Sequence, residues 1–146
     1  MRMTLQTDYA LRMLIHAALR QDRSCTVSDV AEAYGLSRNH LLKVALKLRR
    51  LGFINTMRGR AGGIRLAMPP DRINIGALVR ATEEDLSPVE CMQGRACAIS
   101  PACRLKGIFG EALNAYLSIL DKYTLADIVR NRGALAALLD IDLQAA

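Results

Sequence analysis

Residues 34–70 of the chain read YGLSRNHLLKVALKLRRLGFINTMRGRAGGIRLAMPP. This segment carries many lysine and arginine side chains and no carboxylate. Ser37 is a favourable N-cap residue, and the apolar residues after it recur with helical spacing until Gly52 ends the pattern. The opposite face of this predicted helix is polar and mostly basic, with Asn39, Lys43, Lys47 and Arg50. The sequence therefore predicts an amphipathic helix with a basic outer face.

Predicted elements on both sides of this helix complete a winged helix-turn-helix. Before it, Thr26 and Asp29 have the spacing of a capping box, with Asp where Glu is usual, which predicts a short helix up to about Tyr34. After it, residues 53–57 and 64–67 alternate as short strands around a glycine-rich hairpin tip. A short helix, a turn with glycine, an amphipathic helix and a hairpin follow one another in the order of this motif.

The remaining segments predict further helices and one long loop. Apolar residues at helical spacing predict a first helix from about residue 7 to 20, and Asn74 can cap a helix that runs to about residue 83. Residues 84–104 have no sustained period, which favours a functional loop. A long helix from residue 105 has a heptad-like apolar pattern, and a last short helix follows it. Because the long helix has more apolar face than a small domain can cover, we expect it to pack against a partner subunit.

Composition and charge restrict the class of protein. With 51% hydrophobic residues but no apolar run near the ~20 residues of a membrane span, the chain is expected to be soluble, with no membrane partner. The first eight residues are too polar for a signal peptide, which favours the cytoplasm. Residues 1–70 hold 12 Lys and Arg against 4 Asp and Glu, whereas residues 71–146 hold 8 against 10. This asymmetry is typical of a nucleic-acid reader joined to a sensing or dimerising part.

The basic helix face and the hairpin tip together predict an interface with double-stranded promoter DNA. An α-helix fits the major groove, where the early turns of the second motif helix could reach base edges and flanking phosphates. Arginines on the wing could track phosphates or enter a minor groove. A nucleotide-binding loop is a weaker interpretation, because the wing glycines precede a strand and the Walker pattern is absent. The predicted DNA-binding residues are Ser37, Arg38, Asn39, His40, Lys43, Lys47, Arg58 and Arg60.

Three of the four cysteines, Cys91, Cys97 and Cys103, have the spacing C-x5-C-x5-C. In a reducing cytoplasm such a group favours metal or cluster binding over a structural disulfide. Zinc would prefer shorter gaps, and both zinc and an iron-sulfur cluster need a fourth ligand that the local sequence lacks. A thiol-disulfide switch remains an alternative. Cys25 and His16 are interpreted as structural, and no catalytic arrangement can be placed together, so an enzyme is not expected.

Several segments, in their joint order, resemble the iron-sulfur winged-helix repressors, and within that family its nitric-oxide-sensitive branch. They are LQTDYALR at 5–12, YGLSRNH at 34–40, RGRAGGIRL at 58–66, PACRLK at 101–106 and YTLAD at 123–127. Related regulators of cluster assembly carry a histidine where this chain has Lys106, which counts against that branch.

The resemblance implies a homodimer with an iron-sulfur cluster bound between winged-helix subunits. In the family, three cysteines ligate the cluster. The corresponding residues of this chain are Cys91, Cys97 and Cys103. In at least part of the family an aspartate at the start of the first helix of the other subunit is the fourth ligand, and that position is Asp8 here. A 4Fe-4S cluster is favoured, with 2Fe-2S as the alternative. Without the family, Asp8 is interpreted as a carboxylate that stabilises a helix N-terminus.

The expected fold class is mainly α with a small β wing, as a winged helix-turn-helix plus a long dimerisation helix. Residues 1–83 are expected to form the DNA-binding domain and residues 84–104 the cluster-binding loop. Residues 105–146 are expected to form the dimerisation helix and a C-terminal helix that packs on the DNA-binding domain.

The expected function is that of a cytoplasmic repressor that senses nitric oxide through its cluster and releases its operator when the cluster is nitrosylated. The first alternative is an iron- or redox-responsive repressor of the same family. The others are an electron-transfer protein whose basic half docks an acidic partner, and a cluster-free thiol sensor.

Overall fold

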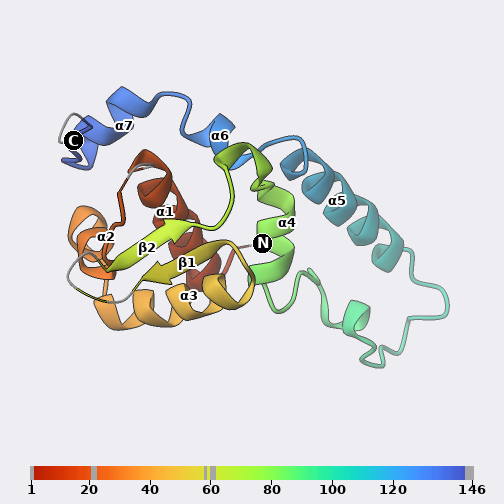
Figure 1. Ribbon diagram of the computed structural model, residues 1–146. Helices are drawn as coiled ribbons and strands as arrows, with labels where there is room; N and C mark the ends of the chain where they lie inside the picture. The colour runs from red at the N-terminus through yellow and green to blue at the C-terminus, as the bar shows by residue number, and fades with distance from the viewer. Residues whose placement is uncertain (1, 21–22, 58, 60–61, 144–146) are drawn as a thin grey trace.

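The structure is a computed structural model that describes residues 2–20, 23–57, 59 and 62–143 (Figure 1). The described part of the chain is mostly helical with one two-stranded antiparallel sheet, which confirms the expected fold class of mainly α with a small β wing. The wing residues Arg58 and Arg60, expected to bind DNA, lie outside the described residues. In chain order the elements are α1 (Leu5–Leu19), α2 (Val27–Tyr34), α3 (Arg38–Arg50), β1 (Ile54–Met57), β2 (Gly63–Leu66), η1 (Pro70–Arg72), α4 (Ile75–Thr82), η2 (Glu90–Gln93), α5 (Leu105–Leu120), α6 (Leu125–Ile128) and α7 (Arg132–Leu138).

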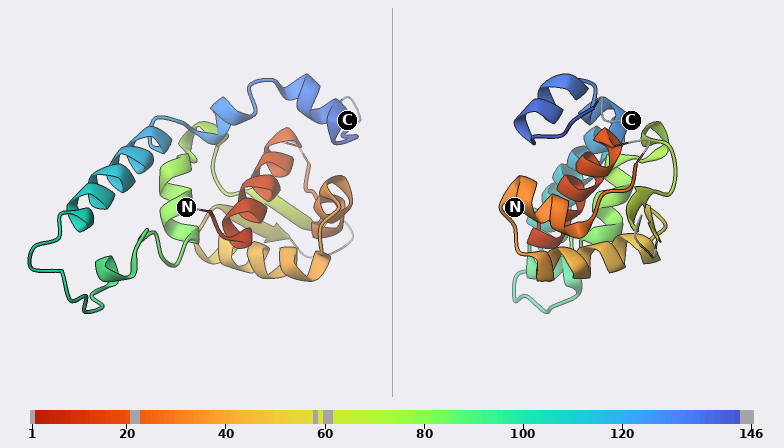
Figure 2. Two further views of the ribbon diagram at one scale, coloured as in Figure 1. Left: turned by 180° about the vertical axis from the view of Figure 1, so that it is seen from behind. Right: turned by 60° about the vertical axis from the view of Figure 1, so that its left-hand side comes forward.

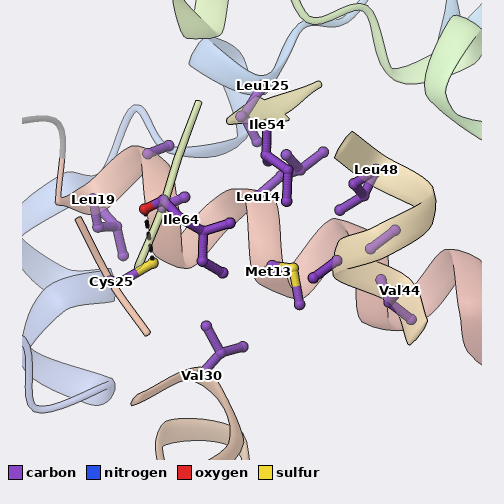
Figure 3. Packing of buried hydrophobic residues seen from close by; sticks show 14 of the residues in the cluster. Met13, Leu14, Leu19, Cys25, Val30, Val44, Leu48, Ile54, Ile64 and Leu125 are labelled. Carbon is purple, nitrogen blue, oxygen red and sulfur yellow. Dashed lines mark hydrogen bonds between the residues drawn. The ribbon is translucent and has the colours of Figure 1, made fainter. Parts of the chain in front are cut away.

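Helix α1 lies at the centre of the packed part of the chain. It begins at Leu5, before the expected residue 7, because the Thr4 hydroxyl accepts a hydrogen bond from the Thr7 N–H. Helices α2, α3, α4, α6 and α7 and strand β2 all contact it. Its buried apolar residues therefore face several elements at once, as Figure 3 shows around Met13, Leu14 and Leu19.

The helix-turn-helix forms as its local signals predict. The Thr26 hydroxyl accepts from the Asp29 N–H at 3.1 Å while the Asp29 carboxylate accepts from the Thr26 N–H at 2.8 Å, so the capping box is present. Gly35 ends α2 in the left-handed region at φ 61°. The apolar stripe of α3 is buried as expected, through Leu41, Val44, Ala45 and Leu48.

A third extended segment, at Cys25, pairs with the wing. Strands β1 and β2 pair antiparallel from Ile54 opposite Leu66 to Met57 opposite Gly63. Main-chain hydrogen bonds of 3.0 and 2.7 Å join Cys25 to Ile64. A Cβ on Gly63 would lie 2.7 Å from the Cys25 carbonyl oxygen, so this close approach requires glycine. The wing is therefore attached to the loop between α1 and α2 as well as to α3.

The cysteine loop and α5 project from the packed body. In Figures 1 and 2, residues 84–104 run outward from α4, and α5 returns along the same side toward α6. Leu117 is the one residue of α5 that is buried within the described chain. At its inner end α5 is joined to α4, because Arg80 donates hydrogen bonds of 2.6 and 2.7 Å to the Asp121 carboxylate. A side chain at Gly76 would collide with that carboxylate.

The end of the chain differs from the sequence-based expectation. A single short C-terminal helix was expected after Thr124, but the structure has two, α6 and α7. The Thr124 capping box starts α6 as predicted, and the chain then leaves the helical conformation before α7, with Asn131 at φ −89° and ψ 54°. Leu125 and Ala136 are buried where these helices cover α1. Within the described residues, no helix is long and apolar enough to cross a bilayer.

His16 is a buried polar side chain with no role in hydrogen bonding among the described residues. It is 1% exposed, and neither ring nitrogen has a partner. Burial, assisted by the positive charge of Arg20, lowers the pKa of His16 to about 4. The ring is therefore neutral in the folded protein at neutral pH, which supports the structural role expected for it.

Acid should destabilise the protein through His16. The folded-state pKa lies below the ordinary value of 6.5, so the unfolded state binds the proton first and stability falls as pH drops from about 6.5 to 4. We expect His16→Leu to remove about 3 kcal/mol of this loss by pH 4, measured by urea unfolding at a series of pH values. If the variant and the wild type lose stability in parallel, the acid sensitivity arises elsewhere.

Candidate nucleic-acid interface and metal centre

The first turns of α3 present an exposed polar surface. Ser37, Arg38, Asn39, His40 and Lys43 are all exposed. Ser37 occupies the expected N-cap position, but its side chain makes no capping hydrogen bond, so the hydroxyl is not used to cap α3. Arg38 Nε donates to the Ser28 hydroxyl of α2 at 3.1 Å, which ties the two helices together at this surface. A helix end with unused donors on its outer side can approach base edges and phosphates.

Lys47 is placed differently from the other expected DNA-binding residues. It is half-buried, and its ammonium group donates a hydrogen bond of 2.8 Å to the Thr82 carbonyl oxygen at the end of α4. Sequence reasoning could not reveal this contact, because it joins residues 35 positions apart.

An apolar groove lies between α3 and the wing. Leu42 and Leu46 of α3 are 42% and 46% exposed and line it together with Thr56. The groove has a volume of about 260 Å³. Such side chains are suited to contact with thymine methyl groups, so the surface of α3 combines polar and apolar contact groups.

The three loop cysteines are free thiols. Cys97 is exposed, and Cys91 and Cys103 are half-buried. In the part of the chain that the structure describes, no group of three or more Cys, His, Asp and Glu side chains is arranged to hold a metal ion. The donor type fits an iron-sulfur cluster, since thiolates are its usual ligands. A complete set of ligands, however, does not come together within the described residues of one chain.

Asp8 lies in the first turn of α1 and forms an ion pair. Its carboxylate is 3.0 Å from an Arg12 guanidinium nitrogen, and Arg12 Nε donates to it at 3.1 Å. The Asp8 side chain is 40% exposed, so it can be reached from outside the chain. Arg12 also lies over the Tyr34 ring, 5.7 Å from its centroid, which holds the guanidinium in place. The single chain thus brings Asp8 to Arg12 and not to the cysteines.

Cys25 has a different environment from the loop cysteines. It is fully buried in the core, and its thiol contacts the Ile64 carbonyl oxygen at 3.8 Å. Burial raises the pKa of the Cys25 thiol to about 11, an effect to which the Asp29 charge contributes. A thiol that stays protonated is a poor nucleophile and a poor metal ligand, so Cys25 is a structural residue.

Comparisons with known proteins agree with this arrangement. Residues 3–131 match the Rrf2 family, described as an iron-dependent transcriptional regulator. The HTH-type transcriptional regulator NsrR of Bacillus subtilis (strain 168) is 50% identical over 142 residues, which cover 95% of this chain and 97% of that protein. The protein of the same name from Halalkalibacterium halodurans is 49% identical over 144 residues, which cover 97% and 99%.

Solved structures of transcriptional regulators share the fold. CymR of Bacillus subtilis, the global cysteine regulator, has a TM-score of 0.71 at 25% identity, with 90% of this chain and 98% of that chain covered. IscR of T. potens has a TM-score of 0.71 at 23% identity, with 90% and 88% covered, which shows a likeness of fold.

Thiol alkylation should separate the four cysteines into two classes. In the reduced, metal-free protein we expect iodoacetamide to modify Cys91, Cys97 and Cys103 within minutes and to leave Cys25 unmodified until the protein is unfolded. Intact-mass and peptide mass spectrometry would count and locate the adducts. A fourth adduct under native conditions would contradict the burial of Cys25.

Proposed function

Because the chain belongs to the Rrf2 family of transcriptional regulators, we propose that it is a cytoplasmic repressor that binds double-stranded promoter DNA as a homodimer. The family that the sequence segments resemble is thereby confirmed. The observation that carries the proposal is the exposed first part of α3, residues 37–40 and Lys43, in a segment without carboxylates. Two such helices in a dimer would enter successive major grooves, roughly 34 Å apart. Arg58 and Arg60 would add contacts to phosphates or a minor groove.

We propose that Cys91, Cys97 and Cys103 hold an iron-sulfur cluster of the 4Fe-4S type, with the partner subunit's Asp8 as fourth ligand. Three free thiols, the lack of a complete ligand set within one described chain and the iron-dependent character of the family support this proposal. When bound, the cluster supplies iron with which nitric oxide reacts. The resemblance to the nitric-oxide-sensitive branch and the 50% identity to a relative named NsrR favour nitric oxide as the signal.

The Asp8 carboxylate would have two alternative partners, Arg12 of its own chain and the cluster held by the other subunit. In the arrangement described here it pairs with Arg12 at 3.0 Å. In the ligated dimer it would turn toward the cysteine loop of the other subunit, and Arg12 would keep its position over the Tyr34 ring. Without ligation, the carboxylate would pair with Arg12 as it does here, and residues 84–104 would no longer be held to the other subunit. Because this loop connects α4 with α5, its release would alter how the DNA-binding part is held relative to the dimer helix.

Nitric oxide should release DNA from the protein. We expect stepwise anaerobic addition of nitric oxide to bleach the cluster absorbance and to lower the affinity for promoter DNA at least about tenfold over the same range. Absorbance and fluorescence anisotropy of a labelled duplex would be recorded on one sample. Bleaching without DNA release would point to iron or redox state as the signal. A cluster-loaded protein without sequence-specific DNA binding would support electron transfer, and a protein without iron would support a thiol sensor.

Asp8→Ala is the companion variant in this titration. We expect an altered cluster spectrum and a changed response to nitric oxide, because the only non-thiolate ligand is removed. Asp71→Ala, which removes an exposed carboxylate from η1, is the matched control and should behave as wild type. If Asp8→Ala has the wild-type spectrum and response, Asp8 is not a cluster ligand, and its role is the ion pair with Arg12.

The dimer interface is proposed to include the apolar stripe of α5. Ile108 and Ile119 are 56% and 54% exposed, and Leu105 is 53% exposed. These residues lie on one side of the helix, and a contiguous exposed apolar surface of this kind is typical of an interface. Asn114 lies on the opposite side and is also exposed.

Ile108→Glu should convert the dimer into monomers at micromolar concentration, because association would bury an unpaired charge. Asn114→Glu is the matched control, with the same added charge on the other side of the helix, and should remain dimeric. Sedimentation velocity would give both masses. If Asn114→Glu dissociates the dimer and Ile108→Glu does not, the interface uses the other face of α5.

A further inference from the structure

The last two residues before the cysteine loop receive hydrogen bonds from two other helices. The Thr82 carbonyl oxygen accepts from Lys47 of α3 at 2.8 Å. The Thr82 hydroxyl lies 2.9 Å from the Thr7 hydroxyl of α1, and both threonines are buried. The Glu83 carboxylate accepts from the Thr4 N–H at 2.8 Å and from the Thr4 hydroxyl at 3.0 Å. We call these five residues, Thr4, Thr7, Lys47, Thr82 and Glu83, the Thr82 junction.

The charges within the junction support one another. Burial alone would raise the pKa of the Glu83 carboxyl, but the nearby Thr7 hydroxyl, the hydrogen bonds from Thr4 and the charge of Lys47 lower it below its ordinary value. Glu83 is therefore ionised at neutral pH and attracts the Lys47 ammonium group. The Thr82 carbonyl belongs to the last turn of α4, where main-chain oxygens lack intrahelical partners and carry partial negative charge. Both features hold the Lys47 ammonium group against α4.

The junction connects the three parts of the proposed function. Thr7 immediately precedes Asp8, the proposed ligand. Lys47 lies on α3 one turn after Lys43, within the helix proposed to read DNA. Glu83 immediately precedes residues 84–104, the cysteine loop. A displacement of the first loop residues would therefore act directly on both α1 and α3.

Lys43 and Lys47 lie on adjacent turns of α3, but their side chains differ in burial and in hydrogen bonding. Lys43 is exposed and makes no side-chain hydrogen bond to any described residue. Lys47 is half-buried, and its ammonium group is already hydrogen-bonded toward α4. The Lys47 ammonium group has three N–H donors, but one is held by the Thr82 carbonyl and the side chain is half-buried, so Lys47 is less available to a DNA phosphate than the exposed Lys43.

We propose that Lys47 is a positioning residue that couples the cysteine loop to the recognition helix through the Thr82 carbonyl, and that it does not contact DNA. The inference rests on the proposed function and reassigns one residue that the sequence alone groups with the DNA contacts. The orientation of α3 then depends on where the start of the cysteine loop is held.

The test compares Lys47→Met with Lys43→Met in the cluster-loaded dimer. The probe is a duplex selected by the wild-type protein from a random-sequence pool, with a scrambled duplex as the non-specific reference. Affinity is measured over a range of KCl concentrations. The slope of log affinity against log salt is negative, and each lost phosphate contact reduces its magnitude by about 0.9, so Lys43→Met should reduce the magnitude by about 2 in a dimer.

Lys47→Met should leave that slope unchanged. Its affinity for the selected duplex should fall about tenfold while its affinity for the scrambled duplex stays at the wild-type value. The ratio of affinities between cluster-loaded and cluster-free protein should also fall, by about fivefold or more. If Lys47→Met reduces the magnitude of the slope and weakens binding to both duplexes as Lys43→Met does, Lys47 contacts phosphate and the inference is wrong.

Two further measurements distinguish a failure of this inference from a loss of protein stability and from a failure of the proposed function. If Lys47→Met does not melt cooperatively, Lys47→Gln, which keeps an N–H donor, takes its place in the same titration. In DNA-free wild-type protein, acetylation by an N-hydroxysuccinimide ester should be slower at Lys47 than at Lys43, and Glu83→Ala should speed it at Lys47. Equal acetylation rates at Lys47 and Lys43 would contradict the hydrogen bonding of Lys47 in the Thr82 junction. Wild-type protein that binds neither duplex would instead overturn the proposed function.

Discussion

Burial of helix α1 on several sides is the constraint from which the arrangement of the chain follows. A helix with Ala10, Ala17 and Ala18 among its buried residues allows neighbouring elements to approach closely. Met13 and Leu14 fill the remaining space and are fully buried (Figure 3). Because no single neighbour can cover such a helix, α3, the wing, α4 and the C-terminal helices all pack on it. The two ends of the chain thereby stabilise the same core.

This constraint determines which parts of the chain are held and which are left uncovered. Helix α3 turns its apolar stripe toward α1, which leaves its basic face outward. Residues 84–104 and most of α5 are not packed on α1, so Cys97 and several apolar side chains of α5 are exposed. The outward basic face of α3 is suited to the proposed DNA contacts. The exposed apolar side chains of α5 are suited to packing against a second subunit. The proposed DNA contacts and the proposed dimer interface therefore both involve side chains that are not part of the hydrophobic core.

Local sequence signals explain why most helix boundaries could be predicted. Several helix ends are fixed by residues only a few positions apart, so they do not depend on distant parts of the chain. They are the capping boxes at Thr26 and Thr124, the Asn74 cap and the glycine after α2. The start of α1 was predicted too late, because the Thr4 cap has no Glu or Gln at the position that usually reveals one. The break between α6 and α7 was missed for a similar reason, since neither Gly nor Pro lies between the two helices.

The sequence by itself determined the class of the fold, the basic face of α3 and the group of three cysteines in one loop, because periodicity, charge and spacing are local properties. Contacts between distant residues decided the rest. Tertiary packing gave Cys25 a place beside the wing and a protonated thiol, and it paired Asp8 with Arg12. It also directed Lys47 toward Thr82, although its spacing on α3 groups it with the outward basic residues. Which partner a charged side chain chooses depends on the distance and burial of groups that only the folded chain brings together.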